Sequence, residues 1–171
     1  MSFKDIEINT EYRSGKSDVI KDFYIPVLSR AVKYKRAVGF FSSTALIQIA
    51  KGISEMVVNG GHIQLIASPR LSEEDILAIQ KGYESREQIV TNAIMREFKE
   101  PTSYFESERL NMLATLIAVG KLDIKIAFTH GRNQLGIYHE KMGLVYDSDN
   151  NIIAFSGSTN ESETAFIDNY E

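Results

Sequence analysis

Two pairs of polar residues with the same spacing lie close together near the end of the sequence. Residues 137–160 read IYHEKMGLVYDSDNNIIAFSGSTN. Side chains alternate along a β-strand, so His139 and Lys141 are expected on one side and Glu140 on the other. Ser158 and Asn160 repeat this spacing just past the next predicted strand. If the two strands are neighbours, an imidazole, an ammonium, a hydroxyl and a carboxamide converge.

These four groups suit the chemistry of a phosphodiester. A lysine neutralises a non-bridging oxygen, and serine and asparagine donate hydrogen bonds to the charge that develops in the transition state. A neutral imidazole can attack phosphorus and form a covalent intermediate. The pattern therefore predicts a phosphoryl-transfer site, with no cofactor and no metal ion among its parts.

The order of these residues resembles the phospholipase D superfamily, whose signature is HxKxxxxD followed by GSxN. His139-Glu140-Lys141 and Gly157-Ser158-Thr159-Asn160 match it, and Asn169-Tyr170-Glu171 looks like the closing N-x-E of the family. The resemblance implies that His139 forms a covalent phosphohistidine and that Lys141, Ser158 and Asn160 hold the phosphate. It also implies that Glu171 orients the imidazole, as the third member of a triad does.

One position departs from the family signature. The aspartate of the motif would fall at Tyr146, and the nearest carboxylate, Asp147, comes one residue later. A shift of one residue reverses the face of a strand, so Asp147 could substitute only if a bulge intervened. We therefore leave Asp147 out of the predicted site.

The chain carries half of the family's usual site. The superfamily mechanism uses two such histidines, whereas His62 and His130 stand in GHIQ and THGR, without HxK. Resemblance to the small bacterial nucleases of the superfamily implies a homodimer in which both His139 side chains face one active site across a two-fold axis. A second motif in a further segment of a longer protein is the less favoured alternative.

The N-terminal part adds to the resemblance. RAVGFFSS at 36–43, the helix predicted after it and a long helical region look like the N-terminal nuclease-like domain that is fused to helicases in bacterial restriction or defence proteins. We therefore expect residues 1–171 to be one phospholipase D-like domain from the N-terminal part of a longer protein, with a C-terminal helicase as a possible partner domain.

The remaining pattern predicts a mixed α/β fold. Apolar spacing indicates a helix over 19–31, a buried strand over 35–41, a helix capped by Ser43 or Thr44 and ended by Asn59-Gly60-Gly61, and a strand over 62–67. A strand-helix-strand unit favours parallel pairing. Capping signals at Ser72 and Ser103 predict two or three helices within 72–120.

Short strands follow this helical excursion. They are expected at Leu122–Thr129, Ile137–Tyr146 and Ile152–Phe155, with turns at Gly131-Arg132-Asn133 and Asp147–Asn151. The predicted architecture is thus a phospholipase D-like mixed β-sheet covered by helices.

Composition bounds the function. The 171 residues include no cysteine, which excludes disulfides, thiolate metal sites and cysteine nucleophiles. No apolar run approaches a membrane span and no secretory signal opens the chain, so a cytoplasmic location is expected. The net charge of −4 argues against broad adhesion to a polyanion, although residues 1–60 carry nine Lys or Arg against six Asp or Glu.

The sequence therefore predicts a metal-independent phosphodiesterase that acts on nucleic acid, with DNA the expected substrate. Two alternatives stay open. One is a non-catalytic module for nucleic-acid binding or dimerisation. The other is a phospholipid phosphodiesterase, which is disfavoured because no amphipathic helix with a basic face is evident.

Overall fold

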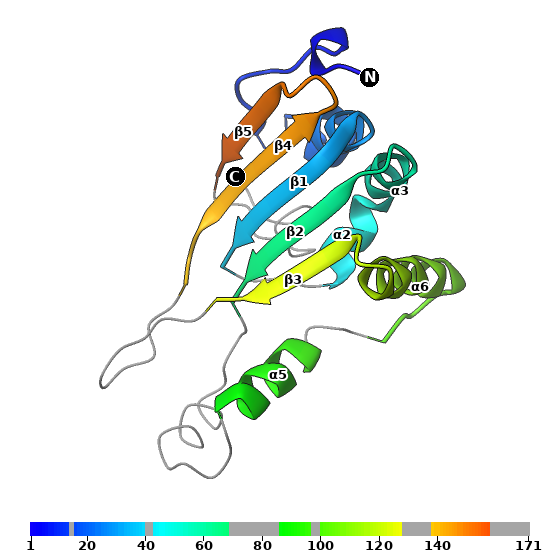
Figure 1. Ribbon diagram of the computed structural model, residues 1–171, viewed down its shortest axis with the longest axis vertical. Coiled ribbons are helices and arrows are strands. Elements are labelled where there is room, and N and C mark those ends of the chain that lie inside the picture. Colours follow the sequence, from blue (N-terminus) through cyan, green and yellow to red (C-terminus); the bar gives the residue numbers. More distant parts are fainter. Residues whose placement is uncertain (14–15, 40–42, 69–85, 97–99, 128–137, 158–171) are drawn as a thin grey trace.

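A five-stranded mixed sheet forms the centre of the molecule. The computed structural model describes residues 1–13, 16–39, 43–68, 86–96, 100–127 and 138–157. The strands lie in the order β3-β2-β1-β4-β5 (Figure 1). Their bounds are β1 Ala31–Val38, β2 His62–Ala67, β3 Leu122–Ile126, β4 Lys141–Asp147 and β5 Ile152–Ser156. The prediction of a mixed α/β sheet is confirmed.

The pairing brings several strand ends to one edge of the sheet. β1 pairs in parallel with β2, and β2 with β3, as the strand-helix-strand pattern predicted for the first pair. β4 runs antiparallel to β1, and β5 runs antiparallel to β4. Consequently β1, β2, β3 and β5 end at the edge where β4 begins. We call it the carboxyl edge.

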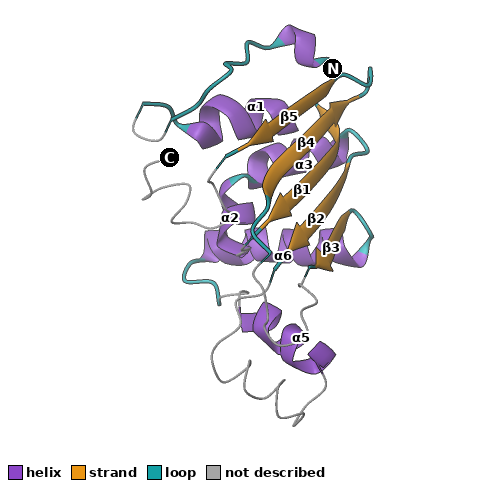
Figure 2. Ribbon diagram, turned by 90° about the vertical axis from the view of Figure 1, so that its left-hand side faces the viewer, coloured by secondary structure: helices purple, strands orange, loops and turns teal. Residues whose placement is uncertain are grey.

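Helices cover one face of this sheet. Figures 1 and 2 both show α1, α2, α3 and α6 on the same side. The helical segments are η1 Phe3–Asp5, η2 Ile20–Tyr24, α1 Ile25–Leu28, α2 Ser43–Gln48, α3 Ala50–Val58, α5 Arg86–Arg96 and α6 Tyr104–Ala118. The expectation that helices cover the sheet holds for this face. In the described part of the chain the opposite face carries no helix, and we call it the open face.

The core lies between the sheet and the helices. Alternate residues of β1 and β2 point into it, so that Tyr34, Val38, Ile63 and Leu65 are all buried. The helices contribute further buried side chains, namely Leu28, Ile49, Ile53, Met56, Leu113 and Leu116. This packing places β1 and β2 at the centre of the sheet, with one face of each strand buried in the core.

The first predicted helix is shorter than expected. It was predicted to reach Ala31, but it begins as the π-helix η2, continues as α1 and ends at Leu28. Pro26 has no N–H for the helical ladder, which helps to explain the irregular start. Ala31 instead opens β1, four residues before the predicted strand, because antiparallel pairing with Asp147 extends β1 in that direction.

The second predicted helix is divided in two. Ile49, with φ −95° and ψ 9°, separates α2 from α3, although its side chain is buried. The predicted end at Asn59-Gly60-Gly61 is confirmed. Gly60 has φ +80°, and the N–H groups of Gly60 and Gly61 donate to the carbonyls of Val57 and Met56.

The helical excursion is confirmed where it is described. It contains α5 and α6, and the Ser103 hydroxyl caps α6 by accepting from the N–H of Glu106 at 3.2 Å. The Glu106 carboxylate accepts from the N–H of Thr102 at 2.7 Å rather than from the capping residue. The predicted start at Ser72 lies outside the described residues.

The later strands begin or end differently from the prediction. β4 begins at Lys141 instead of Ile137, because β1 ends at Val38 and its pairing with β4 stops at Lys141. The turn before β5 is present, and Asn150 has a positive φ of 62° within it. β3 ends at Ile126 rather than Thr129, and the predicted turn at Gly131-Arg132-Asn133 lies outside the described residues.

Candidate active site at the carboxyl edge of the sheet

The carboxyl edge is where an open α/β sheet most often binds a ligand. The described residues at this edge include Gly39 after β1, His139 and Lys141 at the start of β4, and Gly157 after β5. The sheet topology therefore brings the HxK segment and the first residue of the GSTN segment to one place, as the sequence pattern required.

His139 and Lys141 lie in direct contact. The Nζ atom of Lys141 is 2.7 Å from Nε2 of His139. An ammonium can only donate a hydrogen bond, so Nε2 is the acceptor and the proton of a neutral ring belongs on Nδ1. His139 is exposed and Lys141 is half-buried. The arrangement places a ring nitrogen that accepts a hydrogen bond beside a cation, and a nucleophile next to a positive charge suits the chemistry of a phosphodiester.

Gly39 provides the surface against which His139 packs. A Cβ atom at position 39 would lie 2.9 Å from Cδ2 of His139, 3.2 Å from the carbonyl oxygen of Tyr138 and 3.3 Å from Cα of His139. A side chain at position 39 would force the His139 ring or the Tyr138 backbone to shift, so glycine favours this close approach. Sequence reasoning did not single out Gly39, although a glycine that directly follows a buried strand is a recognisable signal.

The strand leading to GSTN is the immediate neighbour of the strand that begins with Lys141. β4 and β5 pair with Met142 opposite Ser156, and the Gly157 N–H donates to the Lys141 carbonyl at 3.3 Å. The adjacency on which the predicted site depended is therefore present as far as Gly157. Ser158, Asn160 and Glu171 lie outside the described residues, and their roles stay predictions.

Asp147 has a structural role at the other end of β4. Its carboxylate accepts from the backbone N–H groups of Phe3, Asp149 and Asn151 at 2.8 to 2.9 Å, and from the side chains of Asn151 and Ser2. Burial alone would raise the pKa of this carboxyl, but the donors outweigh it and lower the pKa to about 2. Six residue steps, or about 20 Å of strand, separate it from Lys141.

The remaining histidines do not complete the site within the described residues. His62 begins β2 and pairs with Lys33, at the end of the sheet opposite the carboxyl edge. His130 lies outside the described residues.

Next to His139, burial raises the pKa of Tyr138 and the Glu140 carboxylate adds to the rise, so this phenol stays neutral at pH 7.

A cavity of about 630 Å³ adjoins Gly157. The N-terminal segment, η2, β1 and β5 line it, with Tyr12, Phe23, Arg36 and Phe155 among its walls. Arg36 is only 3% exposed, and its guanidinium lies 5.1 Å from the ring centre of Phe155. Alternation along β1 turns Arg36 toward the helix-covered side of the sheet.

The described residues show no separate metal centre. Within them, no three His, Asp or Glu side chains are grouped as ligands for an ion. None of the described helices is both long and apolar enough to cross a lipid bilayer. No protein-family model matches the chain, and no curated protein matches it either.

Proposed function

We propose that the chain is a metal-independent phosphodiesterase of the phospholipase D type that cleaves nucleic acid, with DNA as substrate. The observation that carries the proposal is the contact between Nε2 of His139 and Nζ of Lys141, beside Gly157 at the carboxyl edge. A phosphate entering this position would take over the hydrogen bond from Lys141 and free the electron pair of Nε2 for attack.

The reaction proceeds in two displacements. Nε2 of His139 attacks phosphorus, a P–N bond forms, and the P–O bond to the leaving strand breaks. His139 of the partner subunit, in its protonated form, gives a proton to the leaving oxygen. That ring then accepts a proton from water as the water oxygen attacks phosphorus. The P–N bond breaks and both histidines return to their starting states.

Each expected site residue has a defined place in this scheme. Lys141 neutralises a non-bridging oxygen throughout, while Ser158 and Asn160 donate hydrogen bonds to the charge in the transition state. Glu171 accepts from the imidazole and holds its tautomer. Gly39 allows His139 to lie against the end of β1. The chain would belong to a helicase-linked restriction or defence protein.

Cleavage of end-labelled single-stranded and duplex DNA in excess EDTA tests the proposal. We expect the wild type to cleave, His139→Ala to show no cleavage, and Lys141→Ala to lose about 10²-fold to 10³-fold in rate. Lys51→Ala, an exposed lysine on α3, is the matched control and should retain full rate. All variants should keep the wild-type unfolding midpoint within a small margin.

The alternatives predict different outcomes. An inactive wild type that binds DNA in a verified dimer favours a non-catalytic module. Cleavage of phosphatidylcholine vesicles without cleavage of DNA favours the phospholipid alternative. Full activity of His139→Ala contradicts the proposed mechanism in either case.

A further inference from the structure

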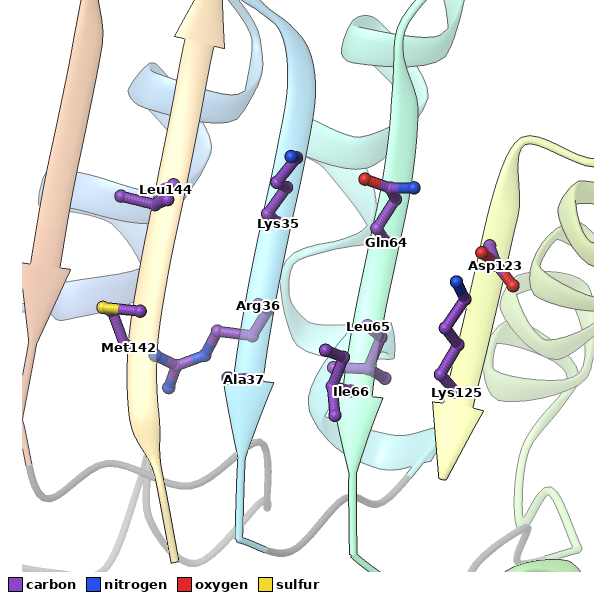
Figure 3. Close-up of a pocket in the computed structure, with 10 residues that line it drawn as sticks. All are labelled: Lys35, Arg36, Ala37, Gln64, Leu65, Ile66, Asp123, Lys125, Met142 and Leu144. Carbon is purple, nitrogen blue, oxygen red and sulfur yellow. The ribbon is translucent and has the colours of Figure 1, made fainter. Parts of the chain in front are cut away.

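The open face of the sheet has a regular arrangement of side chains. The strand register places Ile66 beside Ala37 and Met142 nearest the carboxyl edge, and Lys35 beside Leu144 in the next row. Figure 3 shows these side chains on the same face, with Gln64, Asp123 and Lys125 extending it over β2 and β3. The face is thus polar at Lys35, Gln64, Asp123 and Lys125, toward β3, and apolar around Ala37, Ile66, Met142 and Leu144, toward β4 and the carboxyl edge.

Positive charge is concentrated on the polar half of this face. Lys33, Lys35 and Lys125 are exposed there, and Asp123 is the carboxylate among them. None of these lysines forms an ion pair within the described residues. The Nζ atoms of Lys33 and Lys35 instead lie 5.4 and 6.0 Å from the ring centre of Tyr146. The whole chain has a net charge of −4. On this face, however, three lysines outnumber one aspartate, and this local positive charge favours anions.

The apolar half remains accessible to a ligand. Met142 is 46% exposed and Ile66 39% exposed, and they border a shallow cavity of about 270 Å³ that also includes Leu144. Crossover helices usually cover both faces of a parallel sheet, so an uncovered face on parallel strands is a candidate surface for a ligand. A ligand for this face should therefore pair anionic groups with flat apolar ones.

We propose that the open face binds single-stranded nucleic acid, with phosphates at Lys35 and Lys125 and bases against Met142, Leu144 and Tyr146. Unpaired bases can lie on apolar and aromatic side chains, whereas a duplex keeps its bases stacked inside and offers only its backbone and groove edges. Met142 lies on this face at the carboxyl edge, one residue after Lys141, whose side chain is turned to the helix-covered side by alternation, so a strand on this face reaches the edge that carries the candidate active site. The proposal extends the proposed function and rests on it for the choice of nucleic acid.

Equilibrium binding of a fluorescein-labelled 20-mer of thymidine tests this proposal. The measurement uses His139→Ala protein, so that cleavage does not consume the probe. Adding Lys35→Ala and Lys125→Ala should weaken binding about tenfold or more. The slope of log K against log salt should become shallower by about 0.7 for each lysine removed. Lys51→Ala in the same His139→Ala protein is the matched control and should leave affinity and slope unchanged.

Three results would overturn the proposal. Unchanged affinity and slope in the double lysine variant would show that Lys35 and Lys125 do not contact the phosphates. Tighter binding of a duplex of equal length would contradict the single-strand preference. Dissociation of a dimer by Met142→Glu, with probe binding unchanged, would show that the face is instead a protein interface.

The test separates this proposal from the proposed function. Binding that depends on Lys35 and Lys125, together with a wild type that cleaves no DNA, would support the open-face site and contradict the nuclease. Cleavage by the wild type, with unchanged binding in the double variant, would support the nuclease and contradict the open-face site.

Discussion

Asp147 shows how one buried carboxylate can connect distant segments. It joins the N-terminal segment, through Phe3, to the turn between β4 and β5, through Asp149 and Asn151. Its folded pKa, about 2, lies below the ordinary value of 3.8. Because the folded pKa is depressed, the charged form stabilises the fold above about pH 4, and this stabilisation is lost as the pH falls toward 2.

We therefore predict that Asp147→Asn lowers the free energy of unfolding at pH 7 by about 2 kcal/mol, from about 1.4 kcal/mol for each unit of pKa depression. The difference from wild type should shrink as the pH falls from 4 to 2. Urea unfolding at several pH values measures it, with the exposed Asp149→Asn as the matched control. Equal stability of Asp147→Asn and wild type at pH 7 would show that this carboxylate does not hold the segments together.

Gly39 affects the candidate site through His139. Alanine at this position would force the His139 ring and the backbone of Tyr138 to move, because its Cβ would lie 2.9 to 3.3 Å from their atoms. A displacement of about 1 Å at a reacting group can cost about 10²-fold in rate. Gly39→Ala should therefore lower the single-turnover cleavage rate by about this factor, with little change in DNA affinity.

A stability control separates positioning from unfolding. Gly60 has φ +80°, so Gly60→Ala strains the end of α3 by about 1 to 2 kcal/mol, yet it lies far from His139 along the chain and in the fold. It should lower the unfolding midpoint and leave the cleavage rate intact. If Gly39→Ala and Gly60→Ala lose rate only in proportion to stability, Gly39 does not position His139.

At the scale of elements, the prediction of a strand was most accurate where residues next to it in the sequence determine its ends. β2 has its predicted bounds of 62–67, because Gly61 precedes its apolar run and Pro69 follows it. The starts of β1 and β4 were misplaced because each depends on how far the other strand pairs with it. That information lies in the register between residues more than a hundred positions apart.

The candidate site was predictable to a similar extent. Spacing predicted that His139 and Lys141 lie on one side of a strand, and it made convergence with the GSTN segment conditional on neighbouring strands. The structure shows the contact between His139 and Lys141 and the adjacency of β4 and β5 as far as Gly157. Gly39 was missed because its role is a contact between the end of β1 and the segment before β4. The open face was missed because helix periodicity does not tell which side of a sheet a helix will cover.

At the scale of the whole molecule, one chain supplies one HxK segment. In the described residues His62 lies at the end of the sheet opposite His139, so it does not provide the second imidazole. The proposed mechanism needs both an attacking and a protonating ring. We therefore predict a dimer that shares one active site, in which one His139 is phosphorylated at a time.

Mass spectrometry of the covalent intermediate tests this account most directly. Protein is mixed with a DNA oligonucleotide in excess EDTA and examined under native conditions during turnover, and the adduct is then mapped by peptide digestion. We predict a dimer that carries one DNA fragment, attached to His139 and absent in His139→Ala. DNA cleavage by a monomer, or an adduct on any other residue, would contradict the account.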